Sequence, residues 1–364
     1  MRFVKQLALG SITALLLAAC GGGSEQAAKV TYSSVVSFGD SLSDAGTYGS
    51  MWLVNGISTP IGSDPAPSYV WPQLLAAAIV GKPSCAARSQ LGGTGTVTDV
   101  TGCTNYAQGG SRVKDADGTN HAAGAATEPV TVQIEKFLAL APNSKFKGTE
   151  LVTVQGGAND LFAQAKILET GATAAGTAAF FTAREAGKTM EEATAASAAA
   201  GAAYAAGAGA YAAVNNMSTA GKDLADAVKL VIASGAKKVV VMNIPDASQT
   251  PYGVGAGPQQ QPLILAMVQA FNNRLKAELA GQQGVLLLDV FAENQKQFLN
   301  PTQFGLTNVT TEACTTSAAS CNLTNVVAGD ISHYLFADDV HPTPYGHKLL
   351  AQFVNKELVL AGWL

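Results

Sequence analysis

Short, strongly apolar runs recur along the chain and are separated by longer segments of mixed polarity. Four of these runs are rich in Val, Leu and Ile and predict buried strands, at residues 35–38, 151–154, 238–244 and 284–291. Residues 105–107 indicate one further, brief strand end. Strands that are apolar throughout occur mainly in parallel sheets whose two faces are both covered.

Helical periodicity fills most of the segments between these runs. Five helices are predicted, at residues 69–80, 130–140, 222–233, 263–279 and 346–358. Alternation of strands and helices is typical of an α/β fold. We therefore predict one domain over residues 33–364, with three αβα layers around a parallel sheet of about five strands.

One segment, residues 163–220, departs from this alternation because Ala, Gly and Thr dominate it. Ala favours helix but buries little surface, and each Gly inside a helix costs about 1 kcal/mol relative to Ala. The segment is predicted to be a helical insertion between the third and fourth strands. A cap over the substrate and a peripheral hairpin without a chemical role are both open readings.

The first twenty residues have the pattern of a targeting signal. Arg2 and Lys5 precede an apolar run, residues 7–19, which is too short to span a membrane and ends in small residues. Cys20 follows them in an arrangement that resembles a bacterial lipobox, and this implies a lipidated Cys20 as the mature N-terminus. Residues 20–32 then form a flexible tether, and Gly21, which is not acidic, points to the outer membrane. An ordinary secretory signal cut near Cys20 is the alternative.

Composition and charge narrow the class of partner. The chain has 364 residues, of which 48% are hydrophobic and 13% charged, and its formal net charge is −4. Without a basic surface to neutralise phosphates, nucleic acid is not an expected partner. The composition does not set the oligomeric state.

Export would allow the remaining four cysteines to form disulfides. Four cysteines allow three pairings, and closeness in sequence favours Cys85–Cys103 and Cys314–Cys321. A metal site is the competing interpretation, but no Cys-x-x-Cys pair occurs.

The first candidate for chemistry is the turn after the first strand. Gly39, Asp40 and Ser41 follow the apolar run directly, which indicates a tight strand-to-helix turn. There the Ser41 hydroxyl could point into a cleft, and backbone N–H groups could meet a developing anion. The alternative is that Ser41 and Ser43 only cap a helix.

A reactive serine needs a base, and the base needs a carboxylate that orients it. The chain has four histidines. His341 lies just before the last predicted helix, three residues after Asp338, so one imidazole nitrogen could meet Asp338 while the other faces Ser41. The Gly-rich turns at residues 105–111 and 156–160 follow two other strands and could supply donors to an oxyanion, Asn159 among them.

Four segments, at residues 39–42, 105–110, 157–160 and 338–341, resemble in this order the four blocks of the SGNH, or GDSL-type, hydrolases. The resemblance spans residue 35 to about residue 360 and includes the turn at residues 243–246. It implies a flavodoxin-like sheet and no metal or cofactor. No Gly-x-Ser-x-Gly motif is present, which disfavours the α/β-hydrolase fold.

The same resemblance implies a role for each residue of a catalytic triad. Ser41 would be the nucleophile, His341 the general base and then acid, and Asp338 the group that holds the imidazole. Asp339 is the nearest rival, but the Asp-x-x-His spacing of the family selects Asp338.

The resemblance also implies an oxyanion hole made by the N–H of Ser41, the N–H of Gly110 and the side chain of Asn159. Counting five residues on from Asn105 favours Gly110 over Gly109.

These features together predict a carboxylic-ester hydrolase that works through an acyl-serine intermediate. The resemblance implies a lipid ester as the first choice of substrate, while acyl transfer and hydrolysis of acetyl esters or polyesters remain open. The residues expected to line an acyl pocket, unless they pack the core, are Tyr106, Leu161, Phe162 and Tyr345. The rival from another class is a non-catalytic binding lipoprotein on the same scaffold.

Overall fold

The computed structural model describes residues 31–57, 67–93, 96–118 and 127–364. The expected signal peptide, Cys20 and all but the last two residues of the expected tether lie outside the described residues. Among the described helices, none combines the length and apolar character needed to cross a membrane.

The centre of the molecule is a parallel sheet of four strands in the order β1-β4-β5-β6. These strands are β1 (Val35–Phe38), β4 (Leu151–Val154), β5 (Lys238–Met242) and β6 (Val285–Leu288). Residue 105, expected near a fifth strand, forms only isolated parallel bridges, one to Ala86 and one to Ser37 on the free side of β1, so the described sheet has four strands and not five. If the bridge to Ser37 is counted as the second strand, the order is that of flavodoxin-like folds.

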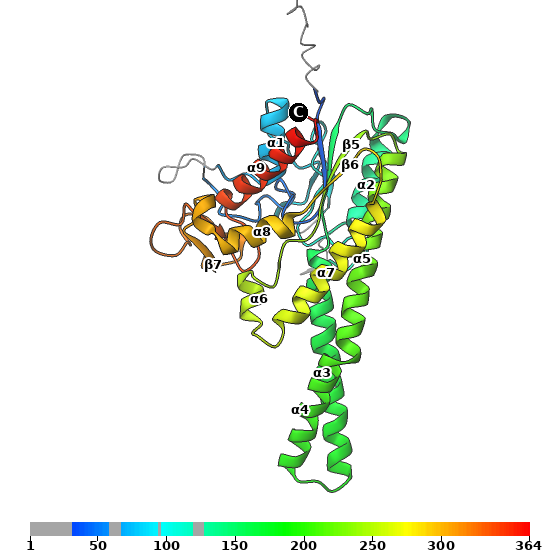
Figure 1. Ribbon diagram of the computed structural model, residues 1–364, viewed down its shortest axis with the longest axis vertical. Helices are drawn as coiled ribbons and strands as arrows, with labels where there is room; N and C mark the ends of the chain where they lie inside the picture. The colour runs from blue at the N-terminus through cyan, green and yellow to red at the C-terminus, as the bar shows by residue number, and fades with distance from the viewer. Residues whose placement is uncertain (1–30, 58–66, 94–95, 119–126) are drawn as a thin grey trace, which may run out of the picture.

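Alternate residues of each strand face opposite sides of the sheet, and helices cover both sides (Figure 1). On one side, Val36, Val152 and Val239 join a buried cluster with α2 (Val130–Leu140), the C-terminal part of α5 (Ala208–Ala233) and α7 (Gln261–Leu279). On the other, Val35, Leu151 and Val240 pack with α1 (Trp71–Val80) and α9 (Pro344–Leu360). The predicted three-layer α/β architecture is therefore confirmed.

The predicted strand at residues 284–291 is too long at its C-terminal end. The strand stops at Leu288, and α8 (Val290–Leu299) begins two residues later. The reason is Asp289, whose carboxylate accepts a hydrogen bond from the N–H of Ala292 at 3.0 Å and so caps the new helix.

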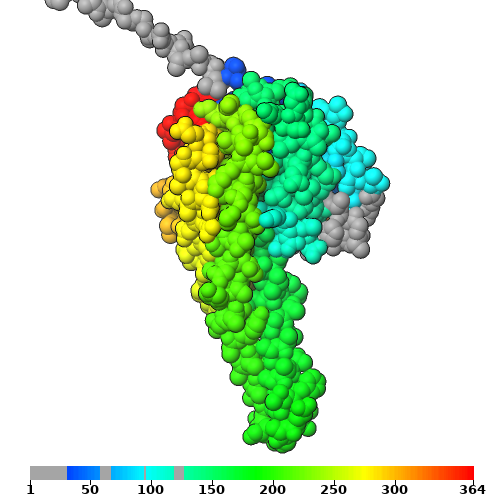
Figure 2. Space-filling model, turned by 90° about the vertical axis from the view of Figure 1, so that its right-hand side faces the viewer, coloured from blue at the N-terminus to red at the C-terminus, as the bar shows by residue number. Residues whose placement is uncertain are grey.

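The Ala-rich segment forms a helical stalk, which we define as residues 170–207. It consists of the end of α3 (Ala158–Glu185) and α4 (Met190–Ala206), and α5 leads back from it to the core. The stalk extends away from the rest of the molecule in both views (Figures 1 and 2). Small residues let α3 and α4 approach closely, since a Cβ on Gly176 would lie 2.9 Å from the carbonyl oxygen of Ser197. The segment is helical as predicted, and both α3 and α5 continue from it into the body of the protein.

Two small sheets and several short helices complete the described fold. Strands β2 (Arg88–Ser89) and β3 (Thr98–Asp99) pair antiparallel, and β7 (Asn308–Glu312) and β8 (Tyr334–Phe336) pair parallel. The short helices are α6 (Pro251–Gly255) and the 3₁₀ turns Leu91–Gly93, Pro142–Ser144, Pro301–Phe304 and Ala318–Ser320. Both predicted disulfides, Cys85–Cys103 and Cys314–Cys321, are present.

Candidate active site

Ser41 lies in a turn at the carboxyl end of β1, and the side chain of Asp40 holds this turn. The N–H of Leu42 donates to Oδ1 of Asp40 at 3.1 Å, and the N–H of Ser43 donates to the carbonyl oxygen of Asp40 at 3.0 Å. Residues 41–43 form a turn and no helix begins there, so the predicted strand-to-helix turn is wrong in its second half. The alternative interpretation, in which Ser41 and Ser43 only cap a helix, is therefore wrong as well.

The chain brings Ser41 and His341 together although 300 residues separate them. Oγ of Ser41 lies 2.8 Å from Nε2 of His341, and Nδ1 of His341 lies 2.8 and 2.9 Å from the two carboxylate oxygens of Asp338. An ionised carboxylate only accepts hydrogen bonds, so Nδ1 carries the proton and Nε2 accepts from the Ser41 hydroxyl. This is the arrangement that a general base needs in order to take a proton from a serine.

Asp338 is held as an anion by several donors. Burial alone would raise its pKa, but the hydrogen bond and charge of His341 and the N–H groups of Ala318 and His341 outweigh burial and lower the pKa to about 2. The N–H of Ala318 donates to Oδ2 at 2.8 Å, and the N–H of His341 donates to Oδ1 at 2.8 Å. The carboxylate therefore stays charged beside the imidazole across the neutral pH range.

The two adjacent residues Asp338 and Asp339 differ in what they contact. Asp338 contacts the imidazole, whereas the part of Asp339 that makes a described hydrogen bond is its carbonyl oxygen, which accepts from the N–H of Tyr252 at 2.9 Å. A second Asp-x-x-His pair, Asp330 and His333, is not arranged in this way. There Oδ1 of Asp330 accepts from the N–H of Ser332, whose hydroxyl lies 3.0 Å from Nδ1 of His333.

The two loops proposed to supply oxyanion donors are tied to the turn and to each other. The N–H of Gly109 donates to Oδ2 of Asp44 at 2.9 Å, which favours Gly110 for the oxyanion, as the spacing does. Gly110 has a φ of 81°, a conformation that suits glycine. Nδ2 of Asn159, in the first turn of α3, donates to the carbonyl oxygen of Ser111 at 3.0 Å. The oxyanion roles of Ser41, Gly110 and Asn159 stay predictions.

Trp52 is a neighbour of the site that the sequence analysis missed. Its ring centroid lies 5.0 Å from that of His341, with 30° between the ring planes. A Cβ on Gly109 would lie only 2.2 Å from Nε1 of Trp52, so the indole rests directly on the glycine. No sequence pattern marks this residue, because it lies in a loop without periodicity.

The residues expected to line an acyl pocket mostly pack the core instead. Tyr106, Leu161 and Tyr345 are buried, with 8%, 0% and 8% of their surface exposed. The hydroxyl of Tyr345 donates to the carbonyl oxygen of Phe304, while Phe162 packs edge-on against Tyr252 at 5.0 Å. The alternative interpretation, that these residues pack the core, therefore fits Tyr106, Leu161 and Tyr345.

Buried polar groups stabilise the turn that contains Ser41. Burial raises the pKa of Asp40 to about 6, although hydrogen bonds from Leu42 and Gln155 act in the opposite direction. Nε2 of Gln155 donates to Oδ2 of Asp40 at 2.9 Å, and Oε1 of Gln155 accepts from the hydroxyl of Ser43 at 3.2 Å. A side chain that comes directly after β4 thus fixes the turn that follows β1.

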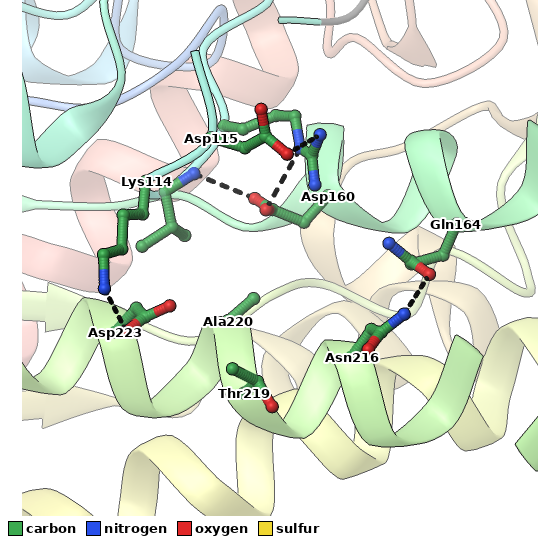
Figure 3. Close-up of a pocket in the computed structure, with 10 residues that line it drawn as sticks. Lys114, Asp115, Asp160, Gln164, Asn216, Thr219, Ala220 and Asp223 are labelled. Carbon is green, nitrogen blue, oxygen red and sulfur yellow. Dashed lines mark hydrogen bonds and ion pairs between the residues drawn. The ribbon is translucent and has the colours of Figure 1, made fainter. Parts of the chain in front are cut away.

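A polar surface pocket of about 410 Å³ lies beside this region, between residues 112–115, α3 and α5 (Figure 3). Its charged groups are paired with one another, Arg112 with Asp115 and Asp160, and Lys114 with Asp223. Neither Ser41 nor His341 lines it. The pocket is therefore separate from the candidate active site.

Comparison with known proteins shows which family this chain matches. A model of the GDSL-like lipase/acylhydrolase family matches residues 35–354. An uncharacterized protein in the trpE-trpG intergenic region of Pseudomonas putida is 31% identical over 153 residues, which are 40% of this chain. The aligned part spans 25% of that relative's length.

Among solved structures, an extracellular lipase from Streptomyces rimosus is 17% identical, with a TM-score of 0.38 over 89% of this chain and 98% of the lipase. An acetyl xylan esterase from Geobacillus stearothermophilus is 12% identical, with a TM-score of 0.41 over 90% of this chain and 96% of the esterase. The family match covers most of the chain, and this protein therefore belongs to the GDSL-like lipase/acylhydrolase family of ester-bond hydrolases.

Proposed function

We propose that this protein is a serine carboxylic-ester hydrolase that works through an acyl-enzyme on Ser41. The observation that carries the proposal is the continuous chain of hydrogen bonds from Oγ of Ser41 through the imidazole of His341 to Asp338, with every step between 2.8 and 2.9 Å. Family membership supports the same class of reaction.

In the first half of the reaction, Oγ of Ser41 attacks the carbonyl carbon of the ester, and its proton passes to Nε2 of His341. The negative charge moves to the former carbonyl oxygen, which the N–H groups of Ser41 and Gly110 and the amide of Asn159 would meet. Loss of one such donor typically costs about 3 kcal/mol in the transition state. The intermediate then collapses, and the alcohol leaves with the proton from Nε2.

In the second half, His341 takes a proton from a water molecule, which attacks the acyl group on Ser41. The same imidazole returns the proton to Oγ as the carboxylic acid leaves. The low pKa of Asp338 matters in both halves, because a charged carboxylate stabilises each imidazolium that forms.

The acyl group is proposed to come from a lipid or a related acyl ester. Acyl transfer to an alcohol and hydrolysis of acetyl esters or polyesters are the alternatives. Rates on p-nitrophenyl esters of increasing chain length, followed by phospholipids, separate them. Turnover of acetyl esters with none beyond them would remove the lipid proposal.

A role of the stalk in covering the substrate is tested separately. Residues 172–205 are replaced by a short Gly-Ser linker, a cut that spares the α5 residues Ala213, Met217 and Ala220 of the core. A cap predicts an altered chain-length preference. Unchanged selectivity would leave the stalk as a peripheral hairpin.

We also propose that Cys20 carries the lipid that anchors the protein to the outer membrane, with secretion in soluble form as the alternative. Labelling with radioactive palmitate tests this. Equal labelling of wild type and a Cys20→Ala variant would exclude lipidation at this cysteine.

The reaction itself is tested with a short-chain p-nitrophenyl ester on wild type, Ser41→Ala and Ser43→Ala. Ser41→Ala should lose nearly all activity. Ser43→Ala is the comparison variant in the same turn: its hydroxyl contacts Gln155 and Trp71 but not His341, so it should lose far less activity than Ser41→Ala. Hydrolysis unaffected by Ser41→Ala would refute the mechanism, and no hydrolysis of any ester would favour a binding lipoprotein.

A further inference from the structure

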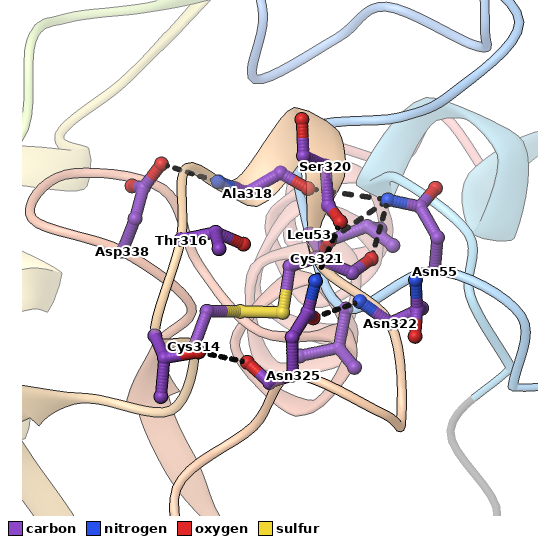
Figure 4. Close-up of a disulfide and its surroundings, with 12 residues drawn as sticks. Leu53, Asn55, Cys314, Thr316, Ala318, Ser320, Cys321, Asn322, Asn325 and Asp338 are labelled. Carbon is purple, nitrogen blue, oxygen red and sulfur yellow. Dashed lines mark hydrogen bonds between the residues drawn. A yellow bond between two sulfur atoms is a disulfide. The ribbon is translucent and has the colours of Figure 1, made fainter.

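The carboxylate of Asp338 also accepts a hydrogen bond from outside the segment 338–341, and this donor comes from a disulfide-closed loop. The N–H of Ala318 donates to Oδ2 of Asp338 at 2.8 Å (Figure 4). Ala318 is fully buried and begins the 3₁₀ turn Ala318–Ser320. It lies between Cys314 and Cys321, whose disulfide closes the loop.

The disulfide loop, residues 314–321, is fixed to the segment that carries Asp338. The N–H of Cys314 donates to the carbonyl oxygen of Ala337, the residue before Asp338, at 2.8 Å. At the other end of the loop, Nδ2 of Asn325 donates to the carbonyl oxygen of Ser320 at 3.0 Å. Both ends are therefore held, and the Ala318 N–H points inward from between them.

The same loop also reaches the imidazole, through Asn55 and Trp52. Nδ2 of Asn55 lies 3.2 Å from the carbonyl oxygen of Ala318 and 3.1 Å from that of Cys321, and the N–H of Asn55 donates to Cys321 at 2.9 Å. Asn55 belongs to the segment of Trp52, whose ring packs against His341. The loop thus contacts the carboxylate of Asp338 directly and the imidazole of His341 indirectly, through the segment that carries Trp52.

We propose that the disulfide loop is a positioning element of the triad, and that the Ala318 N–H is the group through which it acts on Asp338. The proposal rests on the proposed function, because it takes Asp338 to be the orienting carboxylate. Residues 315–317 are exposed and polar, so packing alone gives this short segment little reason to keep one conformation. The cross-link limits the conformations that the loop can adopt and keeps the donor in place.

The sharpest test removes the N–H and leaves the disulfide intact. In Ala318→Pro the ring occupies the place of the amide hydrogen, so Asp338 loses this donor and must shift. The backbone accepts the change, because Ala318 is the first residue of its turn and Ser317 has φ −52° and ψ 142°, which suits a residue before proline. Ser317→Pro is the matched control, since Ser317 is exposed and its φ fits a proline ring.

We expect kcat of Ala318→Pro to fall roughly 10- to 100-fold, the range for loss of a hydrogen bond to a charged group, with KM nearly unchanged. Ser317→Pro should stay within about twofold of wild type. The downfield proton resonance of His341 Nδ1–H should shift or broaden in Ala318→Pro only. Equal kcat values and equal resonances in the two variants would overturn the proposal.

Removal of the cross-link gives a second measurement. Cys314→Ala/Cys321→Ala should lower kcat with little change in KM. Cys85→Ala/Cys103→Ala, which removes the other disulfide, should leave the kcat of the folded protein within a few-fold of wild type. If the two pairs of substitutions lower kcat equally, the effect is one of general stability and the positioning role is refuted.

Failure of this inference can be told from failure of the proposed function. If activity depends on Ser41 but not on the Ala318 N–H, only the inference fails. If activity survives Ser41→Ala, the proposed mechanism fails first.

Discussion

Asp44 accepts a hydrogen bond from the N–H of Gly109 at 2.9 Å, across 65 residues of sequence. The other oxygen of the Asp44 carboxylate accepts from the N–H groups of Gly46 and Thr47 at 2.9 and 2.7 Å. One buried carboxylate thus fixes the Gly109–Gly110 pair relative to the chain that follows Ser41. The position of the proposed Gly110 donor depends on it.

Asp44→Asn should therefore weaken both stability and catalysis. An amide presents one oxygen and one NH₂ group, so one set of N–H donors loses its acceptor whichever way the side chain turns. We expect a loss of about 1.5–3 kcal/mol in unfolding free energy and roughly tenfold in kcat. Asp115→Asn is the control, because its carboxylate is half-exposed and outside the site, and activity close to wild type is expected. Equal activity of the two variants would contradict this account.

Asp338→Asn should lower kcat by roughly 10² to 10⁴, because an amide does not stabilise the imidazolium and permits the wrong tautomer of His341. Asp339→Asn should change kcat only a few-fold, since the described hydrogen bond of Asp339 is made by its backbone. Steady-state rates on one soluble ester compare the two. A larger loss for Asp339→Asn would mean that the carboxylate has been misassigned.

Asn159→Ala should lower kcat roughly 10²- to 10³-fold with a smaller change in KM, as expected for a donor that acts mainly in the transition state. Gln164→Ala, further along α3, is a suitable control, because its side chain pairs with Asn216 in the polar pocket and not with the triad. Loss of binding alone, with kcat preserved, would argue against an oxyanion role.

Asp40 should make stability depend on pH. Its pKa of about 6 in the folded protein exceeds the ordinary value of 3.8, so the folded state binds this proton more tightly than the unfolded state does. The contribution of Asp40 to stability therefore falls as pH rises from about 4 to about 6, by roughly 2–3 kcal/mol. Urea unfolding of wild type and Asp40→Asn at several pH values should show the difference narrowing toward low pH. A difference independent of pH would contradict the prediction.

The sequence predicted the parts of the fold that depend on long apolar runs. Residues 151–154 and 130–140 form the predicted strand and helix with the predicted bounds. Ser41, Asp338 and His341 could be singled out because each lies in a short motif. Ser41 follows a strand of the parallel sheet, where reactive groups are expected, whereas Asp338 and His341 follow β8 of a separate small sheet and were identified from their spacing and the family resemblance.

Other structural features depend on interactions between distant residues, which no local sequence pattern predicts. Strand β6 ends early because Asp289 caps a helix, and residue 105 forms isolated bridges and not a strand. The contact of Trp52 with His341 and the Ala318 N–H on Asp338 both come from loops. A backbone donor has no sequence signature at all, since every residue except proline carries one.

Mass spectrometry of the intact protein and of its proteolytic peptides, after rapid mixing with a slowly hydrolysed p-nitrophenyl ester and quenching, tests the central claim most directly. We predict an increase by one acyl group on the peptide that contains Ser41, formed more slowly in Asp338→Asn and absent in Ser41→Ala. Ester hydrolysis with no such adduct at any time, or with the adduct on another residue, would contradict the acyl-enzyme mechanism.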